Sequence, residues 1–390
     1  MDTVQPFRID VPDETLDDLR RRLAATRWPD EITGAGWDYG TDLAYLKALV
    51  SHWERGFDWR AQETALNRFA QFRADVDGTS LHYVHERGRA TDALPIVLLH
   101  GWPSSFWQMS RLVPLLSDPA RYGGDAADAF DVVAPSLPGY GFSSRPTEPG
   151  VGVARVAELL AELLTERLGY RRVALRASDM GAGVAQQLAL AHPELVVGLH
   201  LSGTSPYLGE LPDDLTPAEQ KFVADAQRWW QEEMAYAMVH ATRPQTLAYA
   251  LNDSPAGLAA WLVEKFRLWS DSGGEVERRF SKDDLLTNLT IYWATETIGS
   301  STRLYYESVR NPGRRGRVEA PTAMLMSSKD MFQTPREWAE RSYRVTRWTE
   351  TSRGGHFLEW EEPELVAEDV KSFFRPLRGE GDGAARSEEG

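Results

Sequence analysis

One short stretch, Ala177-Ser178-Asp179-Met180-Gly181, constrains the fold of this chain more than any other. An apolar run at residues 173–175 precedes it, and a helical pattern at residues 184–190 follows it. Small residues stand two positions before and two positions after Asp179, as a sharp turn requires when it lifts one side chain out of the backbone. The stretch therefore predicts a buried strand, a tight turn and a helix, with one functional side chain at the apex.

The residue at the apex decides the chemistry, and Ser178 and Asp179 are both candidates. With Ser178 at the apex, the positions two residues away are Arg176 and Met180, which are too bulky for the turn. With Asp179 at the apex, both of these positions carry small residues. We therefore expect a raised carboxylate, while the alternative that Asp179 only caps the following helix stays open.

Composition bounds the class of protein. The chain has 390 residues, a formal net charge of −15, 14 Trp and no Cys. The charge argues against nucleic acid and anionic membrane surfaces as partners, and the lack of cysteine excludes disulfides and thiolate metal ligands. We find no signal peptide and no long apolar run, so we expect a soluble cytoplasmic protein. The aromatic residues are consistent with a roomy apolar pocket, although most of them must serve core packing.

Apolar runs and helical patterns alternate along much of the chain. Runs that are apolar on both faces are typical of a parallel sheet covered on each side. They lie at residues 96–99, 132–134, 173–175, 196–199 and 323–326, and a final strand is expected at residues 345–349. Residues 69–76 and 80–86 flank Asp77-Gly78, which predicts a hairpin. We expect an α/β fold with a mostly parallel twisted sheet and helices on both faces.

Changes of pattern divide the chain into five parts. An N-terminal meander of helices and loops that packs on the core is expected first, and a helical, aromatic-rich lid is expected over the strand ends, where ligands bind in such sheets. A short tail rich in Gly, Glu and Ser is expected to be disordered. The parts are the meander (1–68), the first core segment (69–205), the lid (206–320), the second core segment (321–377) and the tail (378–390).

A nucleophile at such a turn needs a base and an acid that orients the base. His356 lies in a glycine-rich loop after the last expected strand, and the order of nucleophile first and histidine last is that of the α/β-hydrolase fold. Asp330 follows the strand at residues 323–326 and is the expected orienting acid. The fallback acids are Glu350 and Glu359, and the less suitable histidines are His192 and His240.

An oxyanion site is expected where the strand at residues 96–99 runs into His100-Gly101-Trp102-Pro103. In this fold one backbone N–H comes from that loop and one from the residue after the nucleophile. We therefore expect the N–H groups of Trp102 and Met180 to form the oxyanion hole. Trp102, Pro103 and Met180 are also expected to line the substrate pocket.

An aspartate nucleophile points to displacement at saturated carbon, because it forms an ester that water can cleave. Epoxides and haloalkanes are both substrates of this kind. A departing halide is best held by N–H donors, and Met180 beside the nucleophile supplies no side-chain N–H, which counts against a haloalkane dehalogenase. An epoxide leaves as an alkoxide that needs a proton, and a tyrosine hydroxyl suits that task.

Several longer motifs carry a resemblance to a known family. The chain resembles the microsomal-type epoxide hydrolases of the α/β-hydrolase fold over residues 6–375, including their N-terminal meander. The matching motifs are Trp28-Pro29-Asp30, His100-Gly101-Trp102-Pro103-Ser104-Ser105-Phe106, residues 251–261 and Arg353-Gly354-Gly355-His356-Phe357. The resemblance implies a cofactor-independent enzyme that binds no metal and converts an epoxide and water to a vicinal diol.

The resemblance also assigns site residues. It implies Asp179 as the nucleophile, His356 as the base and Asp330 as the orienting acid. It places two lid tyrosines that protonate the ring oxygen on Tyr236 and Tyr305, and a slip by one residue to Tyr306 stays open.

The chain departs from the family around the nucleophile, where Ala177, Ser178 and Met180 replace a glycine pair and a Trp. Asp330 stands where mammalian members carry Glu. The membrane anchor of those members is absent, so the resemblance implies a bacterial relative acting in detoxification or in secondary metabolism, antibiotic biosynthesis such as enediyne assembly included. The aromatic lid suits a bulky or aryl epoxide. A homodimer, a haloalkane dehalogenase and a non-catalytic ligand-binding protein stay open as alternatives.

Overall fold

A nine-stranded sheet forms the centre of the molecule in the computed structural model, which describes residues 4–203 and 211–379. The strand order is β1-β2-β3-β5-β4-β6-β7-β8-β9. The pairs β1–β2, β2–β3 and β3–β5 are antiparallel, and all later pairs are parallel. The strands are β1 (Gln5–Phe7), β2 (Gln71–Val76), β3 (Thr79–Glu86), β4 (Leu94–Leu99), β5 (Phe130–Pro135), β6 (Val173–Ser178), β7 (Val196–Ser202), β8 (Val318–Ser327) and β9 (Tyr343–Thr351).

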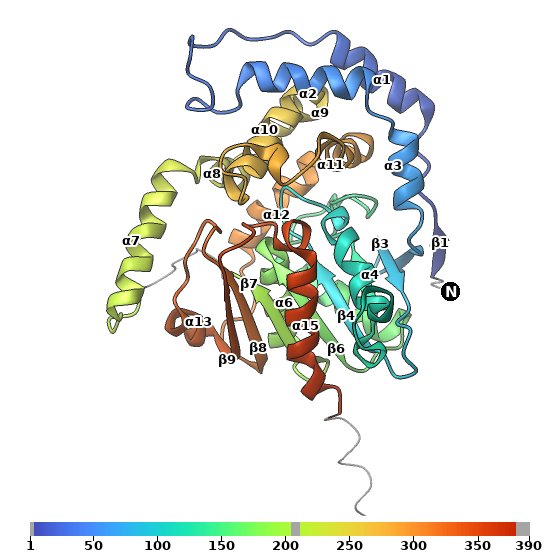
Figure 1. Ribbon diagram of the computed structural model, residues 1–390, viewed down its shortest axis with the longest axis vertical. Coiled ribbons are helices and arrows are strands. Elements are labelled where there is room, and N and C mark those ends of the chain that lie inside the picture. Colours follow the sequence, from blue (N-terminus) through green and yellow to red (C-terminus); the bar gives the residue numbers. More distant parts are fainter. Residues whose placement is uncertain (1–3, 204–210, 380–390) are drawn as a thin grey trace, which may run out of the picture.

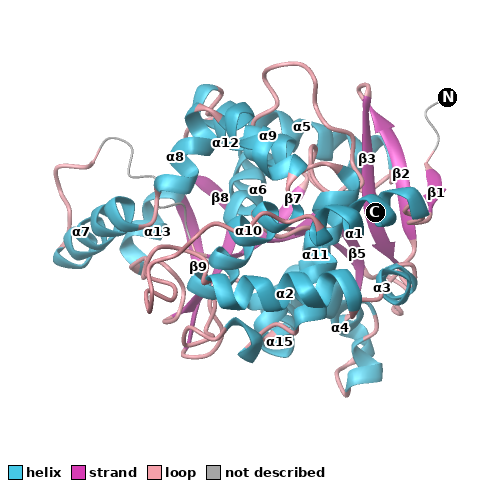
Figure 2. Cartoon of the chain, turned by 90° about the horizontal axis from the view of Figure 1, so that it is seen from above, coloured by secondary structure: helices cyan, strands magenta, loops and turns pink. Residues whose placement is uncertain are grey.

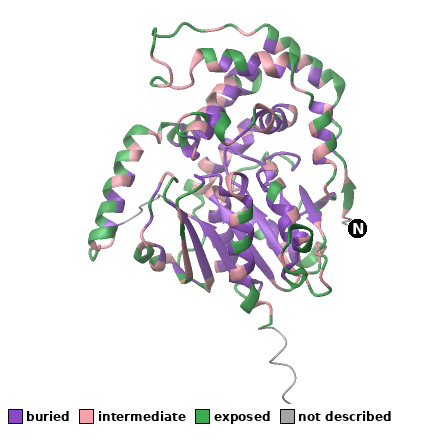
Figure 3. Cartoon of the chain, viewed as in Figure 1, coloured by how far each residue is buried: buried purple, intermediate pink, exposed green. Residues whose placement is uncertain are grey.

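The inner parallel strands β4, β6 and β7 are buried on both faces, as their apolar runs predict, whereas the edge strand β9 is only partly buried. Along β4, Ile96 and Leu98 pack into one apolar cluster, while Val97 and Leu99 pack into another on the opposite face. Figure 3 shows this buried centre, with exposed residues gathered on the outer helices. The expected α/β fold with a mostly parallel sheet is confirmed.

Helices of the core cover both faces of the sheet. Apolar residues of α5 and α6 belong to one of the two clusters, and those of α4 and α15 belong to the other. The helix at residues 184–190 and the helix near Pro363 are therefore present as predicted, within α6 and α15. The core helices are α4 (Leu112–Ser117), α5 (Val153–Glu162), α6 (Asp179–Ala191), α13 (Arg336–Ser342), α14 (Leu358–Glu361) and α15 (Pro363–Phe374).

The predicted hairpin is formed by β2 and β3. Asp77 and Gly78 both have positive φ, 47° and 73°, which gives the twist that a two-residue hairpin turn needs. Strand β1, which pairs with β2, lies in a segment for which the sequence predicts only helices and loops, so that expectation is wrong at residues 5–7. Three residues are too short to show a strand period, and this strand forms only through its pairing with β2.

The N-terminal helices lie over the helices inserted between β7 and β8 (Figures 1 and 2). The Trp53 side chain is buried against this insertion, where its Nε1 donates to Thr290 Oγ1 at 2.9 Å. The first group is α1 (Asp13–Ala24), α2 (Leu43–Arg55) and α3 (Trp59–Leu66). The second is α7 (Pro217–Glu232), α8 (Ala235–Thr242), α9 (Pro244–Asp253), α10 (Pro255–Trp269), α11 (Lys282–Thr295) and α12 (Ile298–Arg310), here called the lid helices.

Local sequence explains where several lid helices begin. Pro217, Pro244 and Pro255 each occupy the first turn of a helix, where their fixed φ is favourable and their missing N–H costs nothing. Thr216 adds a capping box with Glu219. The expected lid begins at residue 206, and its residues 206–210 lie outside the described residues, as does the expected disordered tail from residue 380 onward. No helix within residues 4–203 and 211–379 has both the length and the apolarity that crossing a membrane requires.

Candidate active site

Asp179 lies at the sharp turn between β6 and α6, with a φ of 50°. Backbone packing around the turn is very close. A Cβ on Gly181 would lie 2.4 Å from the carbonyl oxygen of Leu99, and a Cβ on Gly101 would lie 2.3 Å from the Cβ of Asp179. The end of β4 and the start of α6 therefore touch at their backbones, and glycine is needed at both contacts.

The Asp179 carboxylate points away from its own helix. Its Oδ1 accepts a hydrogen bond from the Trp102 N–H at 2.8 Å, and its Oδ2 lies 3.5 Å from His356 Nε2. Helix α6 has Ser178 at its N-cap position and no side-chain cap. The interpretation of Asp179 as a helix cap is therefore wrong. The second expected donor, the Met180 N–H, stays a prediction.

His356 lies between two carboxylates. Its Nδ1 is 3.1 Å from Asp330 Oδ1, on the side opposite Asp179. Burial alone would lower its pKa, but the negative charges of Asp330 and Asp179 outweigh this effect and raise the pKa to about 10. At neutral pH the free site therefore holds an imidazolium between two carboxylates.

The fallback acids have other partners. Glu350 Oε1 accepts from Trp348 Nε1 at 3.0 Å, and Glu359 forms a buried ion pair with Arg176 at 2.9 Å. Among the candidate acids, Asp330 is thus the one whose carboxylate contacts the histidine.

The two expected tyrosines face each other from different lid helices. Tyr236 of α8 and Tyr305 of α12 have ring centroids 6.2 Å apart, and their hydroxyls hydrogen-bond. The Trp102 ring stacks on Tyr236 at 5.2 Å with an interplanar angle of 10°. Burial raises the pKa of both tyrosines far above the usual value, and the charge of Asp179 adds to this, so both hydroxyls stay protonated. Tyr306 instead lies under the Arg310 guanidinium, 3.5 Å from its ring centroid.

His240 is one of the less suitable base candidates by its position in the sequence, yet its ring lies beside the two tyrosines. It is 5.1 Å from Tyr305 and 4.7 Å from Trp102, centroid to centroid. Trp261 Nε1 donates to His240 Nε2 at 3.2 Å, so the proton of the neutral ring is on Nδ1. Burial and the nearby Lys265 charge lower its pKa to about 3, which keeps it neutral. His192 lies elsewhere, paired with Glu158 at 2.8 Å.

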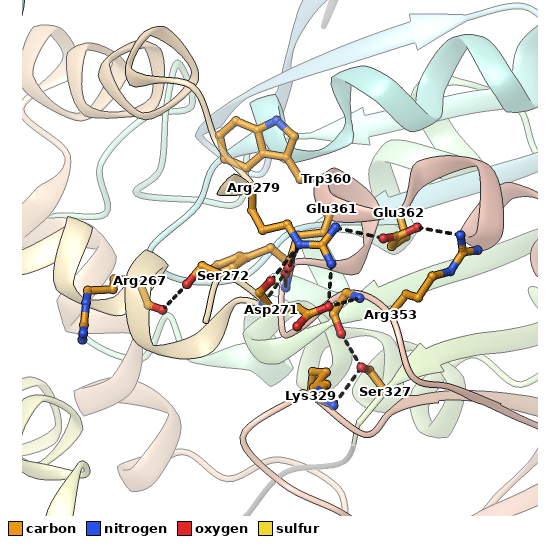
Figure 4. Close-up of polar contacts among 12 residues, drawn as sticks. Arg267, Asp271, Ser272, Arg279, Ser327, Lys329, Arg353, Trp360, Glu361 and Glu362 are labelled. Carbon is orange, nitrogen blue, oxygen red and sulfur yellow. Dashed lines mark hydrogen bonds and ion pairs between the residues drawn. The ribbon is translucent and has the colours of Figure 1, made fainter. Parts of the chain in front are cut away.

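Figure 4 shows a cluster of charged residues that fixes the loop of His356 to the lid. Arg279 is paired with Asp271 at 2.5 Å and with Glu362 at 3.0 Å. Asp271 Oδ2 in turn accepts from the Gly354 N–H at 3.2 Å, two residues before the histidine. The His356 N–H itself donates to the carbonyl oxygen of Trp269 at 2.8 Å. Except for the Arg279–Asp271 pair, these contacts join residues more than 80 positions apart, so the sequence offers no signal for them.

The site is almost enclosed. The side chains of Trp102, Tyr236 and Trp269 are 0%, 6% and 1% exposed. Hollows of about 460 and 430 Å³ elsewhere on the surface are lined by other residues. Within the described residues, no group of three or more His, Asp or Glu is arranged to hold a metal ion. An enclosed, water-poor site strengthens the attraction between these charged groups.

Comparisons with known proteins point in one direction. Residues 4–109 match the family described as epoxide hydrolase N terminus, and residues 95–363 match the alpha/beta hydrolase fold. A Stigmatella aurantiaca (strain DW4/3-1) protein that is provisionally named an epoxide hydrolase is 43% identical over 96% of this chain and 86% of its own. Epoxide hydrolase 1 of Sus scrofa is 32% identical over 96% and 89%. The crystal structure of juvenile hormone epoxide hydrolase from the silkworm Bombyx mori has a TM-score of 0.83 and 28% identity, covering 97% of this chain and 95% of that one.

Proposed function

Because this chain belongs to the epoxide hydrolase family of the α/β-hydrolase fold, we propose that it opens its substrate through a covalent ester on Asp179. Asp179 Oδ2 attacks an oxirane carbon and the ring C–O bond breaks. The released oxygen takes a proton from Tyr236 or Tyr305. Oδ1 stays on the Trp102 N–H, where it becomes the carbonyl oxygen of the ester.

Hydrolysis of the ester needs a base and an oxyanion site. His356 removes a proton from water, and the resulting hydroxide adds to the Asp179 carboxyl carbon. The oxyanion develops on the oxygen next to the Trp102 N–H, with the Met180 N–H as the second donor. Collapse releases the diol, whose oxygen takes the proton from His356. The proton left on the Asp179 carboxyl then passes to His356, and the tyrosinate takes up the proton that His356 gives up when the ester forms. One water is consumed, and the Asp179 carboxylate, the imidazolium and the tyrosine are all restored.

One observation carries this proposal: the two oxygens of Asp179 have different partners, Trp102 N–H at 2.8 Å and His356 Nε2 at 3.5 Å. This is the arrangement needed to hold an ester carbonyl on one side and to direct water from the other. The test is a single turnover in heavy-oxygen water with enzyme in excess. We expect an unlabelled diol and the label in the peptide that contains Asp179. A labelled diol from the first turnover would contradict the covalent route.

We propose a bulky or aryl epoxide as substrate, because the aromatic rings of Trp102, Tyr236 and Trp269 pack together next to His356. The similar silkworm structure is that of a juvenile hormone epoxide hydrolase. A panel of aryl and short-chain epoxides tests this preference. A halide-release assay with 1-bromobutane tests the dehalogenase alternative, and we expect no halide, because Met180 offers no side-chain donor to it.

The remaining proposals rest on the sequence. We propose a cytoplasmic enzyme of bacterial origin that works in detoxification or in secondary metabolism, antibiotic biosynthesis included. A homodimer is a further prediction, and the molar mass in solution, measured by light scattering, tests it.

A further inference from the structure

Glu359 lies in α14, three residues after His356, with its side chain fully buried. Three donors surround its carboxylate. Arg176 Nη2 and Ser178 Oγ lie 2.9 and 3.1 Å from Oε1, and Gln108 Nε2 lies 2.8 Å from Oε2. Each oxygen therefore has its own set of partners.

These partners lead to the two backbone segments that meet at the nucleophile. Ser178 immediately precedes Asp179. Gln108 contacts the Ser104 hydroxyl, which lies 3.0 Å from the carbonyl oxygen of Gly101. Gly101 precedes the residue whose N–H holds the Asp179 carboxylate. Glu359 thus connects two segments through hydrogen bonds: the turn at Ser178 and Asp179, here called the nucleophile turn, and the loop at residues 100–108, here called the oxyanion loop.

Fold stability does not explain this ion pair. Arg176 and Glu359 both have side chains that are 0% exposed, and burying two charges costs about as much as their attraction returns, or more. Arg176 also contacts His200 Nδ1 at 3.0 Å and donates to Ser202 Oγ at 2.7 Å, which fixes the direction of its guanidinium. What such a pair does supply is a defined geometry for the groups attached to it.

We propose that Glu359 is a positioning residue for epoxide hydrolysis, which holds the oxyanion loop and the nucleophile turn together so that the Trp102 N–H stays on the Asp179 carboxylate. The proposal rests on the covalent mechanism above. It assigns Glu359 a role different from that of an acid partner to His356.

The test uses the different partners of the two oxygens. In Glu359→Gln, the remaining oxygen still accepts from Arg176 and Ser178, but the new amide N–H₂ faces the N–H₂ of Gln108. The link from residue 359 to the oxyanion loop is broken, and the buried Arg176 also loses the negative charge of its partner. We expect kcat to fall roughly 10- to 100-fold, as for a displacement of about 1 Å, while KM changes less than about 3-fold.

The matched rescue is the exchange variant Glu359→Gln/Gln108→Glu. It restores a donor facing an acceptor and keeps the total charge, and the Ser104 hydroxyl can still donate to residue 108. We expect kcat to return to within about 3-fold of the parent. Gln108→Glu alone sets two carboxylates against each other and should lose as much activity as Glu359→Gln.

Two results would overturn the role of Glu359. One is a parent-like kcat in Glu359→Gln. The other is an exchange variant that recovers the parent's thermal midpoint but not its kcat. If Glu359→Gln does not fold, the exchange variant alone decides by the same comparison. The isotope experiment on the unaltered enzyme separates the two proposals, because labelled diol there defeats the covalent route whatever Glu359 does.

Discussion

At the scale of single residues, the position of His356 between two carboxylates determines at which step of the proposed reaction its ring can act as a base. In the free site its pKa is raised to about 10, so the ring carries a proton and cannot act as a base. In the proposed mechanism Asp179 becomes an ester, which removes one of the two negative charges beside His356 and so lowers the pKa of its ring. The imidazole then becomes able to deprotonate water at the moment when an ester is present to be cleaved.

Replacing the base should stop the cycle after its first half. In His356→Gln we expect kcat to fall on the order of 10³-fold, because no group removes a proton from water. The ester on Asp179 then accumulates, and intact-protein mass spectrometry should show an increase equal to the substrate mass. Asp179→Asn is the control, since it has no carboxylate to alkylate. An unmodified His356→Gln protein after exposure to a substrate that the parent converts would count against this base.

The raised pKa also predicts how stability depends on pH. The folded value of about 10 exceeds the ordinary value of 6.5, so between these limits the folded state binds more protons than the unfolded state. The contribution of His356 to stability is complete below about pH 6.5 and is lost as the pH rises toward 10. Thermal midpoints at pH 7 to 10 should therefore fall more steeply in the parent than in His356→Asn. Parallel curves for the two proteins would exclude this protonation.

At the scale of elements, the loop between β9 and α14 depends on the lid for its conformation. In the cluster shown in Figure 4, Arg279 forms ion pairs with two glutamates that follow this loop in the chain. The distances are 3.0 Å to Glu362 and 3.7 Å to Glu361. Asp271 connects the same arginine to the Gly354 N–H. The histidine is therefore held by residues that belong to the segment between α10 and α11.

Removing the central cation should loosen this loop. In Arg279→Met we expect a roughly 10- to 100-fold loss in kcat, because His356 is no longer held within reach of Asp179. Arg278→Met is the matched control, since Arg278 is exposed and pairs with Glu275 alone among the described carboxylates. Steady-state kinetics of the two variants make the comparison. Equal kcat in the two variants would show that the ion pairs of Arg279 are not needed to hold the loop of His356 in place.

Some structural features of this protein can be predicted from local sequence, and others cannot. The parallel strands and the turn at Asp179 were predictable, because two-sided apolar runs and small flanking residues are local signals. The pairing of Arg176 with Glu359 joins residues 183 positions apart, and nothing in either neighbourhood indicates a partner. The position of Glu359 in the sequence predicts only an alternative acid partner for His356. Polar pairs of this kind follow from the fold and cannot be derived before it.

At the scale of the whole molecule, one apolar cluster joins the N-terminal helices, the lid and the sheet. It contains Trp53 of α2, Phe266 of α10 and Leu175 of β6. The parts that the sequence separates therefore share this cluster. Their cooperation could not be predicted from the chain alone, because amphipathic helices do not reveal which surface they cover.

A shared core predicts a single unfolding transition. Trp53→Ala should lower the free energy of unfolding by about 3–5 kcal/mol, since Trp53 is 2% exposed and also loses its bond to Thr290. Tyr39→Ala is the control in the same segment, because Tyr39 is 83% exposed and should be nearly neutral. Urea titrations followed by fluorescence and by activity should shift together. An early transition of the N-terminal helices alone would contradict the shared core.

Trp102 takes part in both the chemistry and the closure of the site. Its amide grips the nucleophilic carboxylate, while its indole lies flat against a tyrosine of the lid. A displacement of Tyr236 in α8 would therefore act on the residue whose N–H contacts Asp179. We therefore expect substrate entry past α8 and the orientation of the Asp179 carboxylate to depend on the same residue, Trp102.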